Sequence, residues 1–489
     1  MPTTPLTDQR AAPSRRLAVG VSVGSEGLIL HVDADAFFAS VEQRQKPSTA
    51  TAPVIVCGLG PRGVVATASY QARRFGVGSA MATATAMRRC PHGVFLAPRM
   101  QAYREHSAAI MTVLSRFADA LEQVSIDEAY LEIRSLTIPA DRLITEVASA
   151  VWRATGLRVS VGAGHSKLLA KLASTSAKPQ GVRVISSEQQ QAFLDALPVT
   201  ALPGIGPVAA ARLTEMGINT VAQLRAQPTR LLKRLLGTAA GTAAVAMAQG
   251  RDTRPVGPSR EAKTLSAERT MDYDVPASQL VPVLDTVLDA AHHRLAESGA
   301  TARTVTVRLR NAQFTTIGRS VSLPQASTEL GELRSAALTA LRAATEAMGL
   351  DTEEESGAGA RLLGVALGAL STSTQLTLLP GETAHQTPTD PAALPLPQQD
   401  NQPTALGHRA NDWLPGRDVQ HTELGRGWVV RSMSAQDSPS GTDELHVRFE
   451  TTNSRSARQR RFPIGDPYLT ATAPAPVQRM DRQGGVGLS

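Results

Sequence analysis

The sequence LILHVDADAFFASVEQR, residues 28–44, joins an apolar run to two acidic residues and a pair of phenylalanines. Side chains alternate along a strand, so Asp33 and Asp35 share one face of the strand that this run predicts. Only 3% of the chain is aromatic, which makes the adjacent Phe37 and Phe38 an unusual combination directly after the acids. A buried strand that ends in carboxylates and bulky rings indicates a binding site at that end.

Length, charge and cysteine content limit the class of protein. The chain has 489 residues, a formal net charge of +7 and a sequence pI of about 9.8, a balance that suits a polyanionic partner. Cys57 and Cys90 are too few for a disulfide framework, and we expect buried thiols in a reducing cytosol. No segment reaches the ~18 apolar residues of a membrane span, and residues 1–27 lack the apolar core of a signal peptide. We therefore expect a cytoplasmic protein with no membrane partner.

Composition shifts along the chain predict several domains. Short apolar strands alternate with helical stretches over residues 28–187, which indicates a mixed α/β domain. An Ala- and Leu-rich helical region follows at 199–256, and strands and helices return at 263–370. Residues 371–410 have the Pro, Gln, Thr and Asp content of a linker, and residues 412–468 have the pattern of a small β unit.

A second pair of acids lies in QVSIDEAYLEI, where Asp127 and Glu128 are adjacent between two apolar runs. Neighbours on a regular strand point to opposite faces, so both can reach one site only at a hairpin tip or an irregular strand start. By itself, an adjacent Asp-Glu pair is typical of a solvated turn. Together with Asp33, three carboxylates at one edge would repel one another without a cation, and hard oxygen ligands of this kind suit Mg²⁺.

Three further side chains have the chemistry to hold a triphosphate. Tyr70 and Arg73 are at i and i+3 on a short helix that we expect to end at Gly76. Lys178 ends a second, amphipathic helix, since Pro179 disfavours helical geometry at the residue before it. A guanidinium, a phenol and an ammonium can together grip phosphates. Each of them alone is as well explained as an ordinary surface residue.

Four motifs in a fixed order, HVDADAFFASVEQ, ATASYQAR, SIDEAYLEI and AKPQG, resemble the signature set of the Y-family DNA polymerases, in particular the DNA polymerase IV (DinB) type. The resemblance runs from about residue 28 to 379. It implies a template-directed DNA polymerase of the low-fidelity translesion type, with no recognised proofreading site. The implied partners are primer-template DNA, dNTPs and the sliding clamp, and the implied form is a monomer associated with the nucleoid.

The resemblance also assigns roles to individual residues. It implies that Asp33, Asp127 and Glu128 ligate two Mg²⁺ ions with the backbone carbonyl of Ala34, whereas Asp35 is not a usual ligand of the family. The triphosphate would be gripped by Tyr70, Arg73 and Lys178. Phe38 would be the steric gate that excludes a 2′-hydroxyl, and Phe37 would pack inward, because adjacent helical residues point about 100° apart.

The implied fold class is a multidomain α/β and α+β protein, a right-hand polymerase with an added C-terminal β unit. The expected boundaries are a disordered leader at 1–27, a palm at 28–36 and 100–187, fingers at 37–99, a helical thumb at 188–256, a little-finger domain at 260–371, a linker at 372–410, a small β-barrel-like domain at 411–470 and a tail at 471–489.

Two stretches have patterns that suit DNA contacts. ALPGIGPVAAARLTEMGINTVAQL has the pattern of a helix-hairpin-helix, in which Gly204 and Gly206 allow a tight turn whose N–H groups cradle a phosphate. An ordinary turn between helices would look similar. RTVTVRLRNAQF alternates, with Arg308 and Arg310 on the outward face of a predicted strand. Any one-sided sheet shows this alternation, so the assignment to DNA rests mainly on the resemblance.

The segment after the little finger resembles the bacterial clamp-binding peptide. QLTLL supplies a glutamine and apolar side chains for a groove, and Leu379 departs from the family pattern, which more often ends in Phe; the expected contacts are Gln375, Leu376, Leu378 and Leu379. The C-terminal unit resembles the small barrel of some bacterial DNA helicases and the extension of actinobacterial members of the family. Its basic run suits nucleic acid or a solvated loop equally: Arg455, Arg458, Arg460 and Arg461.

One alternative of another class remains, a catalytically inactive polymerase-like scaffold that binds the clamp and repair proteins. Such a scaffold would lack the metal-binding carboxylates. The sequence retains Asp33, Asp127 and Glu128, and therefore favours the enzyme.

Overall fold

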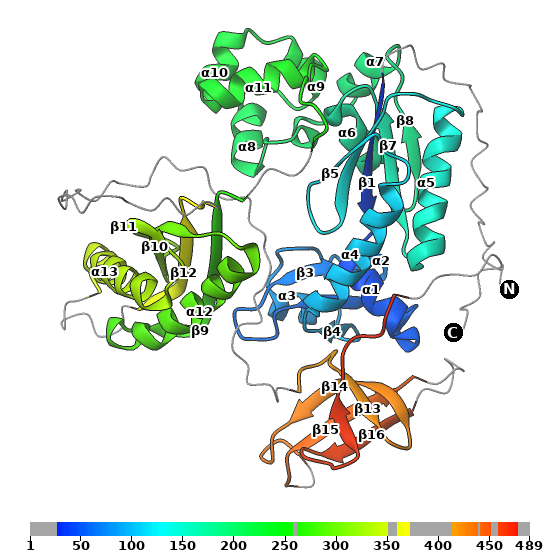
Figure 1. The fold of residues 1–489 in the computed structure, drawn as a ribbon. Helices are drawn as coiled ribbons and strands as arrows, with labels where there is room; N and C mark the ends of the chain where they lie inside the picture. Colours follow the sequence, from blue (N-terminus) through cyan, green and yellow to red (C-terminus); the bar gives the residue numbers. More distant parts are fainter. Residues whose placement is uncertain are drawn as a thin grey trace, which may run out of the picture. The chain divides into compact units, whose positions relative to one another are not determined.

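The computed structural model describes residues 27–257, 262–350, 359–371, 413–438, 441–450 and 458–477. They form two compact units, one from the described residues within 1–35, 107–259 and 477–489 and the other from the described residues within 36–106 and 260–476. Figure 1 shows the elements coloured along the chain. Outside the described residues lie the predicted leader apart from Gly27, the predicted linker with its candidate clamp peptide, and Arg455 of the basic run.

The first unit is organised around a five-stranded sheet in the order β5-β6-β1-β7-β8. The opening apolar run forms its central strand, because every second residue is apolar and both faces are covered. Neighbouring strands are antiparallel except β7 and β8, which run parallel. The strands are β1 (Leu28–Ala34), β5 (Ala120–Gln123), β6 (Glu128–Ile133), β7 (Val159–Gly164) and β8 (Val182–Val184).

Helices α5 (Ala140–Thr155) and α6 (Lys167–Ala177) pack against this sheet. The Ser166 side chain caps α6 by accepting a hydrogen bond from the Leu169 backbone N–H. Gly162 of β7 lets α6 lie close, because a Cβ atom there would be 2.1 Å from the backbone nitrogen of Ser174. The helix ends at Ala177, one residue before the predicted end, and its C-cap Lys178 has the extended backbone expected of the residue before Pro179.

The remainder of the first unit is helical, as predicted. Its core joins the apolar face of α6 to the following short helices, with Leu172 and Leu213 among the buried side chains. The elements are α7 (Gln190–Asp195), the 3-10 helix η2 (Val199–Ala201), α8 (Pro207–Glu215), α9 (Val221–Arg225), α10 (Thr229–Leu236) and α11 (Thr238–Ala248).

The second unit begins with a three-stranded sheet, in the order β3-β2-β4, and the helices around it. Helix α1 starts after Ala36, which takes the left-handed conformation with φ 46°. The predicted helix after Ser69 ends at Arg73, and a turn continues to Gly76, where φ is 73°. The elements are α1 (Phe37–Gln45), η1 (Pro47–Thr49), β2 (Val54–Cys57), β3 (Val65–Ala68), α2 (Tyr70–Arg73), α3 (Thr83–Arg89) and β4 (Val94–Leu96); α4 (Met100–Leu114) crosses from this unit to the first.

A four-stranded antiparallel sheet, in the order β11-β10-β12-β9, follows in the second unit. Two long helices bury one face of it, and Val305, Val307 and Leu309 belong to this core. The elements are β9 (Thr264–Val275), η3 (Ala277–Gln279), α12 (Leu280–Ser298), β10 (Ala302–Asn311), β11 (Thr316–Ser327), α13 (Leu330–Met348) and β12 (Ala360–Gly368).

The C-terminal region is a five-stranded sheet in the order β16-β15-β14-β13-β17. Its core includes Val419, Val447 and Phe449. The last strand ends one residue beyond the predicted boundary at 470, and the pairing of the described strands leaves β16 and β17 as edges. The strands are β13 (Asp418–His421), β14 (Gly425–Met433), β15 (Glu444–Phe449), β16 (Arg458–Pro463) and β17 (Leu469–Ala471).

Two further observations concern the cysteines and the helices. Cys57 and Cys90 are buried and unbridged. None of the helices in the described ranges has the length and apolar character needed to cross a membrane.

Candidate active site

Two of the predicted carboxylates face each other across neighbouring strands. Asp33 of β1 and Glu128 of β6 are direct cross-strand partners in the antiparallel ladder, so their side chains lie on the same face of the sheet. Asp33 is 5% exposed and Glu128 is half-buried. Like charges in this position are unfavourable unless a cation compensates them.

The third carboxylate, Asp127, lies at the tip of the hairpin between β5 and β6. Ser125 holds the tip, because its hydroxyl donates to Asp127 Oδ1 at 2.7 Å and accepts from the backbone N–H of Glu128 at 3.1 Å. The Ala34 backbone N–H donates to the carbonyl oxygen of Asp127 at 3.0 Å, which ties the tip to the end of β1. The irregular strand start expected from the Asp-Glu pair is therefore present.

Helix α6 and its C-cap supply the compensating cations. Lys178 Nζ donates to Asp33 Oδ2 at 2.6 Å, and Lys171 Nζ donates to Glu128 Oε2 at 2.8 Å. Both lysine side chains are about one-third exposed, at 32% and 33%, so their ammonium groups also face solvent. The structure thus brings Asp33, Asp127, Glu128 and Lys178 to one end of the sheet.

Burial sets the electrostatics of the acids. It raises the pKa of Asp33 to about 7, against the opposing attraction of the Lys178 ammonium. It also raises the pKa of Asp127, although the hydroxyl of Ser125 opposes this shift. Burial alone would raise the pKa of Glu128 as well, but His31 and the Lys171 ammonium outweigh it and hold that pKa well below its usual range.

Two neighbours complete the surroundings of these acids. His31 Nδ1 lies 2.7 Å from Ser174 Oγ, and burial lowers the pKa of His31. Asp35 stays on the face that it shares with Asp33, since it accepts hydrogen bonds from Ser160 Oγ at 3.0 Å, the cross-strand partner of Asp33, and from the backbone N–H of Gln180 at 2.8 Å. Asp35 therefore braces β7 and the loop after α6.

The oxygen atoms of these side chains form a possible donor set for a metal ion. The described residues contain no group of three or more His, Cys, Asp or Glu side chains arranged to hold one. Instead, lysines pair with Asp33 and Glu128, and Asp127 bonds to Ser125. The acids still fit a hard divalent cation in chemistry, because they offer only oxygen donors and burial makes the charges of Asp33 and Asp127 costly.

The two phenylalanines of the opening stretch differ as predicted in burial, within the second unit. Phe37 is 2% exposed, whereas Phe38 is half-buried. The ring of Phe38 stacks on Tyr103 of α4, with 4.2 Å between ring centroids and 10° between ring planes. Tyr103 is fully buried, so Phe38 has a fixed wall on one side.

The other predicted phosphate ligands lie on α2 of the second unit. The Arg73 guanidinium lies over the Tyr70 ring, 4.6 Å from its centroid, as the i, i+3 spacing predicts. Arg73 Nε also donates to the carbonyl oxygen of Ala68 at 3.0 Å, which fixes the start of the side chain near β3.

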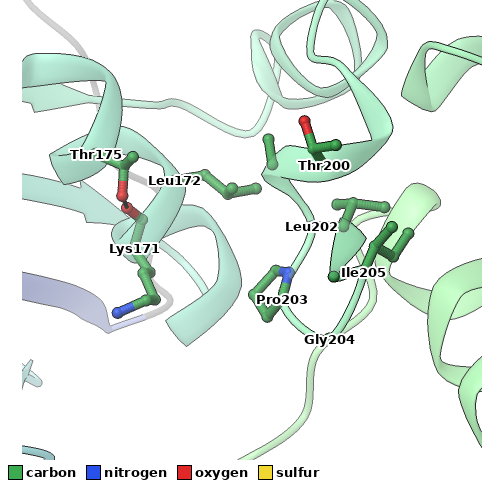
Figure 2. Close-up of a pocket in the computed structure, with 10 residues that line it drawn as sticks. Lys171, Leu172, Thr175, Thr200, Leu202, Pro203, Gly204 and Ile205 are labelled. Carbon is green, nitrogen blue, oxygen red and sulfur yellow. Dashed lines mark hydrogen bonds between the residues drawn. The ribbon is translucent and has the colours of Figure 1, made fainter. Parts of the chain in front are cut away.

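The predicted phosphate-binding turn borders a pocket in the first unit. Gly204 has φ 87°, a conformation that favours glycine, and Gly206 precedes α8. The pocket has a volume of about 480 Å³ and lies between this turn and α6. Figure 2 shows Leu172 pointing toward the turn and the Lys171 ammonium pointing away from it.

The predicted outward arginines of β10 are half-buried on the face opposite the core. Arg308 and Arg310 pair with Gly318 and Thr316 of β11, and Arg310 Nε donates to the Thr316 hydroxyl at 2.9 Å.

Sequence reasoning missed Lys171 and Tyr103. The signal for Lys171 is the spacing of lysines one turn apart on α6, where Lys167 pairs with Glu122 of β5 and Lys171 with Glu128 of β6. No local pattern singles out Tyr103, because its stacking partner lies on another helix.

Comparison with known families agrees with this arrangement. Residues 32–175 match the impB/mucB/samB family, and residues 262–378 match the C-terminal domain of the same family. Residues 200–252 match the thumb domain of DNA polymerase iota.

Similar proteins cover most of the chain. A DNA polymerase IV of Streptomyces coelicolor is 40% identical over 94% of this chain and 93% of its own length. A DNA polymerase IV of Corynebacterium diphtheriae is 34% identical over 91% of this chain and 98% of its own length. Both alignments are too long to end before the C-terminal sheet.

Solved structures show the same architecture over 70% of this chain. The Y-family DNA polymerase chimera of Dbh and Dpo4 has a TM-score of 0.64 and 26% identity, over 70% of this chain and 99% of that one. A Dbh ternary complex has a TM-score of 0.52 and 27% identity, over 70% of this chain and 98% of that one. By fold, motifs and relatives, this chain belongs to the Y-family DNA polymerases of the DNA polymerase IV type.

Proposed function

We propose that this DNA-directed DNA polymerase of the low-fidelity translesion type uses Asp33, Asp127 and Glu128 to hold two Mg²⁺ ions. The direct opposition of Asp33 and Glu128 across β1 and β6, with Asp127 at the adjacent hairpin tip, carries this proposal. Two buried acids with raised pKa values are an unfavourable arrangement for a sheet alone. The backbone carbonyl of Ala34 would assist. An inactive scaffold is not favoured, because all three acids are present.

The chemistry is transfer of a nucleotide from a dNTP to the primer 3′-hydroxyl. Bound divalent cations make that hydroxyl more acidic and neutralise charge on the triphosphate. The chain's own residues position the reactants. Lys178 is a point charge at the end of α6, and Arg73 can bind two phosphate oxygens at once while Tyr70 supports its guanidinium.

Phe38 would exclude ribonucleotides. Its ring rests on Tyr103 and therefore cannot retreat in that direction when a 2′-hydroxyl approaches. Phe37 has no such role, because it is buried in the unit.

DNA would be held by backbone contacts rather than by base contacts. Gly204 and Gly206 present backbone N–H groups at the turn before α8, and Arg308 and Arg310 offer positive charge on β10. We place the palm at 28–36 and 100–187, the fingers at 37–99, the thumb at 188–256 and the little finger at 260–371. The peptide at 375–379 would recruit the sliding clamp to this monomeric polymerase at the nucleoid.

The deciding experiment is primer extension by the Asp127→Ala/Glu128→Ala double variant with Mg²⁺ and dNTPs. Extension should be abolished while DNA binding and the circular dichroism spectrum are retained. Glu146→Ala, which removes an exposed acid of α5, is the matched control and should extend primers normally. An Asp127→Asn/Glu128→Gln variant covers the case in which the alanine pair does not fold. Near-normal extension by a folded double variant would overturn the ligand assignment.

A further inference from the structure

One buried arginine joins the C-terminal sheet to α1 within the second unit. Arg99 precedes α4, and its side chain is 9% exposed. Its Nε and Nη2 atoms donate to Glu42 of α1 at 2.9 Å and 2.8 Å. Its Nη1 atom donates to Asp418, the first residue of β13. One guanidinium therefore bridges two carboxylates that are 376 positions apart in the chain (418 − 42).

Glu42 is the centre of this cluster, and none of its surface is exposed. It accepts hydrogen bonds from Lys46 Nζ at 2.5 Å and from the Tyr103 hydroxyl at 2.7 Å, besides those from Arg99. Burial would raise the pKa of Glu42, but Lys46 and Arg99 outweigh it and lower that pKa to about 2. Glu42 is therefore an anion near neutral pH, and its position depends on its three donors.

The cluster continues to the proposed sugar gate. Tyr103 donates to Glu42 through its hydroxyl and stacks on Phe38 through its ring. A continuous series of contacts thus runs from Asp418 through Arg99, Glu42 and Tyr103 to Phe38. The links are the ion pairs of Arg99, which are part-buried, the buried hydrogen bond of Tyr103 to Glu42 and the stack of Tyr103 on Phe38.

Further contacts seat the C-terminal sheet beside α1. The backbone N–H and the hydroxyl of Ser48 donate to the Glu450 carboxylate at 3.1 Å and 2.5 Å. Gln45 donates to the carbonyl oxygen of Ala475 at 2.6 Å, and the Ala97 N–H donates to that of Pro415 at 2.9 Å. The sheet therefore has several independent contacts here, and Asp418 is the one that reaches Arg99.

Charge balance makes Asp418 important to the cluster. Arg426 of β14 holds the second oxygen of Asp418 at 3.3 Å, so the carboxylate is fixed from its own sheet. Without the negative charge of Asp418, Glu42 alone would balance the charges of Arg99 and Lys46, and Arg426 would lose this carboxylate partner. Removing one partner of a buried charge cluster is costly, and the remaining charges move to reduce the cost.

We propose that the C-terminal sheet is a positioning element for sugar selection, with Asp418 as the positioning residue that fixes Phe38 through Arg99, Glu42 and Tyr103. This inference rests on the proposed role of Phe38 as the gate. The proposal gives the C-terminal sheet a function in the polymerase reaction, whereas the matches to solved structures cover 70% of this chain.

The test compares insertion of dCTP and CTP opposite a template guanine by the full-length Asp418→Asn variant. The ratio of kcat/KM for dCTP to that for CTP should fall about tenfold, or about 1.4 kcal/mol. The change should lie mainly in a lower KM for CTP, while kcat/KM for dCTP stays within about twofold of wild type. Glu423→Gln removes an exposed acid of the same sheet and should leave the ratio unchanged.

A double-variant cycle separates this inference from the gate itself. Phe38→Ala should relax sugar selection, and Asp418→Asn should add nothing in that background, because both act at one ring. If Phe38→Ala keeps full selection, the gate assignment fails. If Phe38→Ala relaxes selection and Asp418→Asn keeps the wild-type ratio, the positioning role fails.

A second variant covers poor folding of Asp418→Asn. Arg99→Lys keeps the charge but cannot bridge two carboxylates as a guanidinium does. Arg99→Lys should lower the ratio of kcat/KM for dCTP to that for CTP as Asp418→Asn does. Ser48→Ala breaks a contact of the same sheet that does not involve Arg99, and it should leave the ratio unchanged. Loss of selection in Ser48→Ala equal to that in Arg99→Lys would overturn the route through Arg99.

Discussion

Asp33 and Glu128 are direct cross-strand partners at the end of the central β1–β6 ladder, and each is paired with a lysine from α6 or its C-cap. Two acids in this position would destabilise a sheet that had only a structural role. Lys178 and Lys171 supply compensating charge to these acids, and in the proposed function Lys178 would exchange its carboxylate partner for a phosphate of the dNTP.

The charge of Asp33 is expected to be essential for synthesis. Asp33→Asn keeps the side-chain volume and an acceptor for Lys178, but it removes a ligand charge. Single-turnover primer extension should fall by about 10²–10³ or more, while DNA binding measured by fluorescence anisotropy is retained. Asp35→Asn is the matched control, and its single-turnover extension should fall much less, because Asp35 bonds to Ser160 and Gln180. Equal losses in the two variants would show that the ligand set is misassigned.

Replacement of Phe37 and replacement of Phe38 are expected to have different effects. Phe37→Ala should lower stability by about 3–5 kcal/mol, because the buried ring leaves a cavity. Phe38→Ala should instead permit ribonucleotide insertion with a smaller change in stability, since its ring is half-buried. Melting temperatures and single-nucleotide insertion of rNTP and dNTP distinguish the two effects. Undiminished discrimination by Phe38→Ala would place the gate at another residue.

The peptide at 375–379 is expected to act only through the clamp. Its residues lie outside the described part of the chain and beyond the little finger, so deletion should leave unassisted extension of a short primer unchanged. Clamp-stimulated synthesis should fall. The measurement is primer extension with and without a loaded clamp, and equal stimulation of both proteins would assign the contact to another surface.

The ion cluster at Glu42 predicts a defined pH dependence of stability. The pKa of Glu42 is lowered from 4.5 to about 2 in the folded protein, so its contribution is complete above pH 4.5 and is lost as the pH falls toward 2. A shift of this size corresponds to about 3 kcal/mol. Wild type should therefore exceed Glu42→Gln in stability most strongly near pH 7, and the difference should shrink below pH 4.5. Urea unfolding at several pH values measures this difference in the free energy of unfolding. A difference that does not change with pH would contradict the lowered pKa of Glu42.

The close approach of α6 to the sheet is expected to depend on Gly162. A Cβ atom there would lie 2.1 Å from Ser174 N and 2.2 Å from Ala170 O, so α6 must move and carry Lys171 with it. Gly162→Ala should cost about 1–3 kcal/mol or more and reduce extension. Gly331→Ala in α13 is the control, because beyond its chain neighbours and the backbone of its own helix no heavy atom lies within 4 Å of its Cβ position. Similar behaviour of the two variants would show that α6 adapts freely.

The catalytic end of the sheet could be predicted because its signals are local. The alternation in residues 28–34 predicts β1, and the adjacency of Asp127 and Glu128 allows few geometries besides the hairpin tip that the structure contains. The predicted end of α2 at Gly76 is less accurate, because the helix ends at Arg73 and a turn continues to Gly76. Hydrogen bonds set the end of a helix, and a glycine in the sequence locates that end only approximately.

The ion pairs could not be predicted because they join distant segments. Lys171 and Glu128 are 43 residues apart, and Arg99 and Asp418 are 319 apart. No periodicity encodes such a partner. Lys46 is fully buried, against the usual preference of lysine for the surface, because Glu42 lies one helical turn before it and Trp428 of the C-terminal sheet lies 5.8 Å away.

The distance between Arg99 and Asp418 along the chain has a consequence for biosynthesis. The ribosome makes Arg99 before it makes Asp418, 319 residues later, a delay of roughly 15–65 s at typical bacterial and eukaryotic rates of translation. During that interval the last two polymerase motifs are made, and Arg99 has Glu42 as its carboxylate partner without Asp418. The wall behind Phe38 is thus finished last, and a messenger truncated after the little finger would encode an enzyme in which that maturation step never takes place.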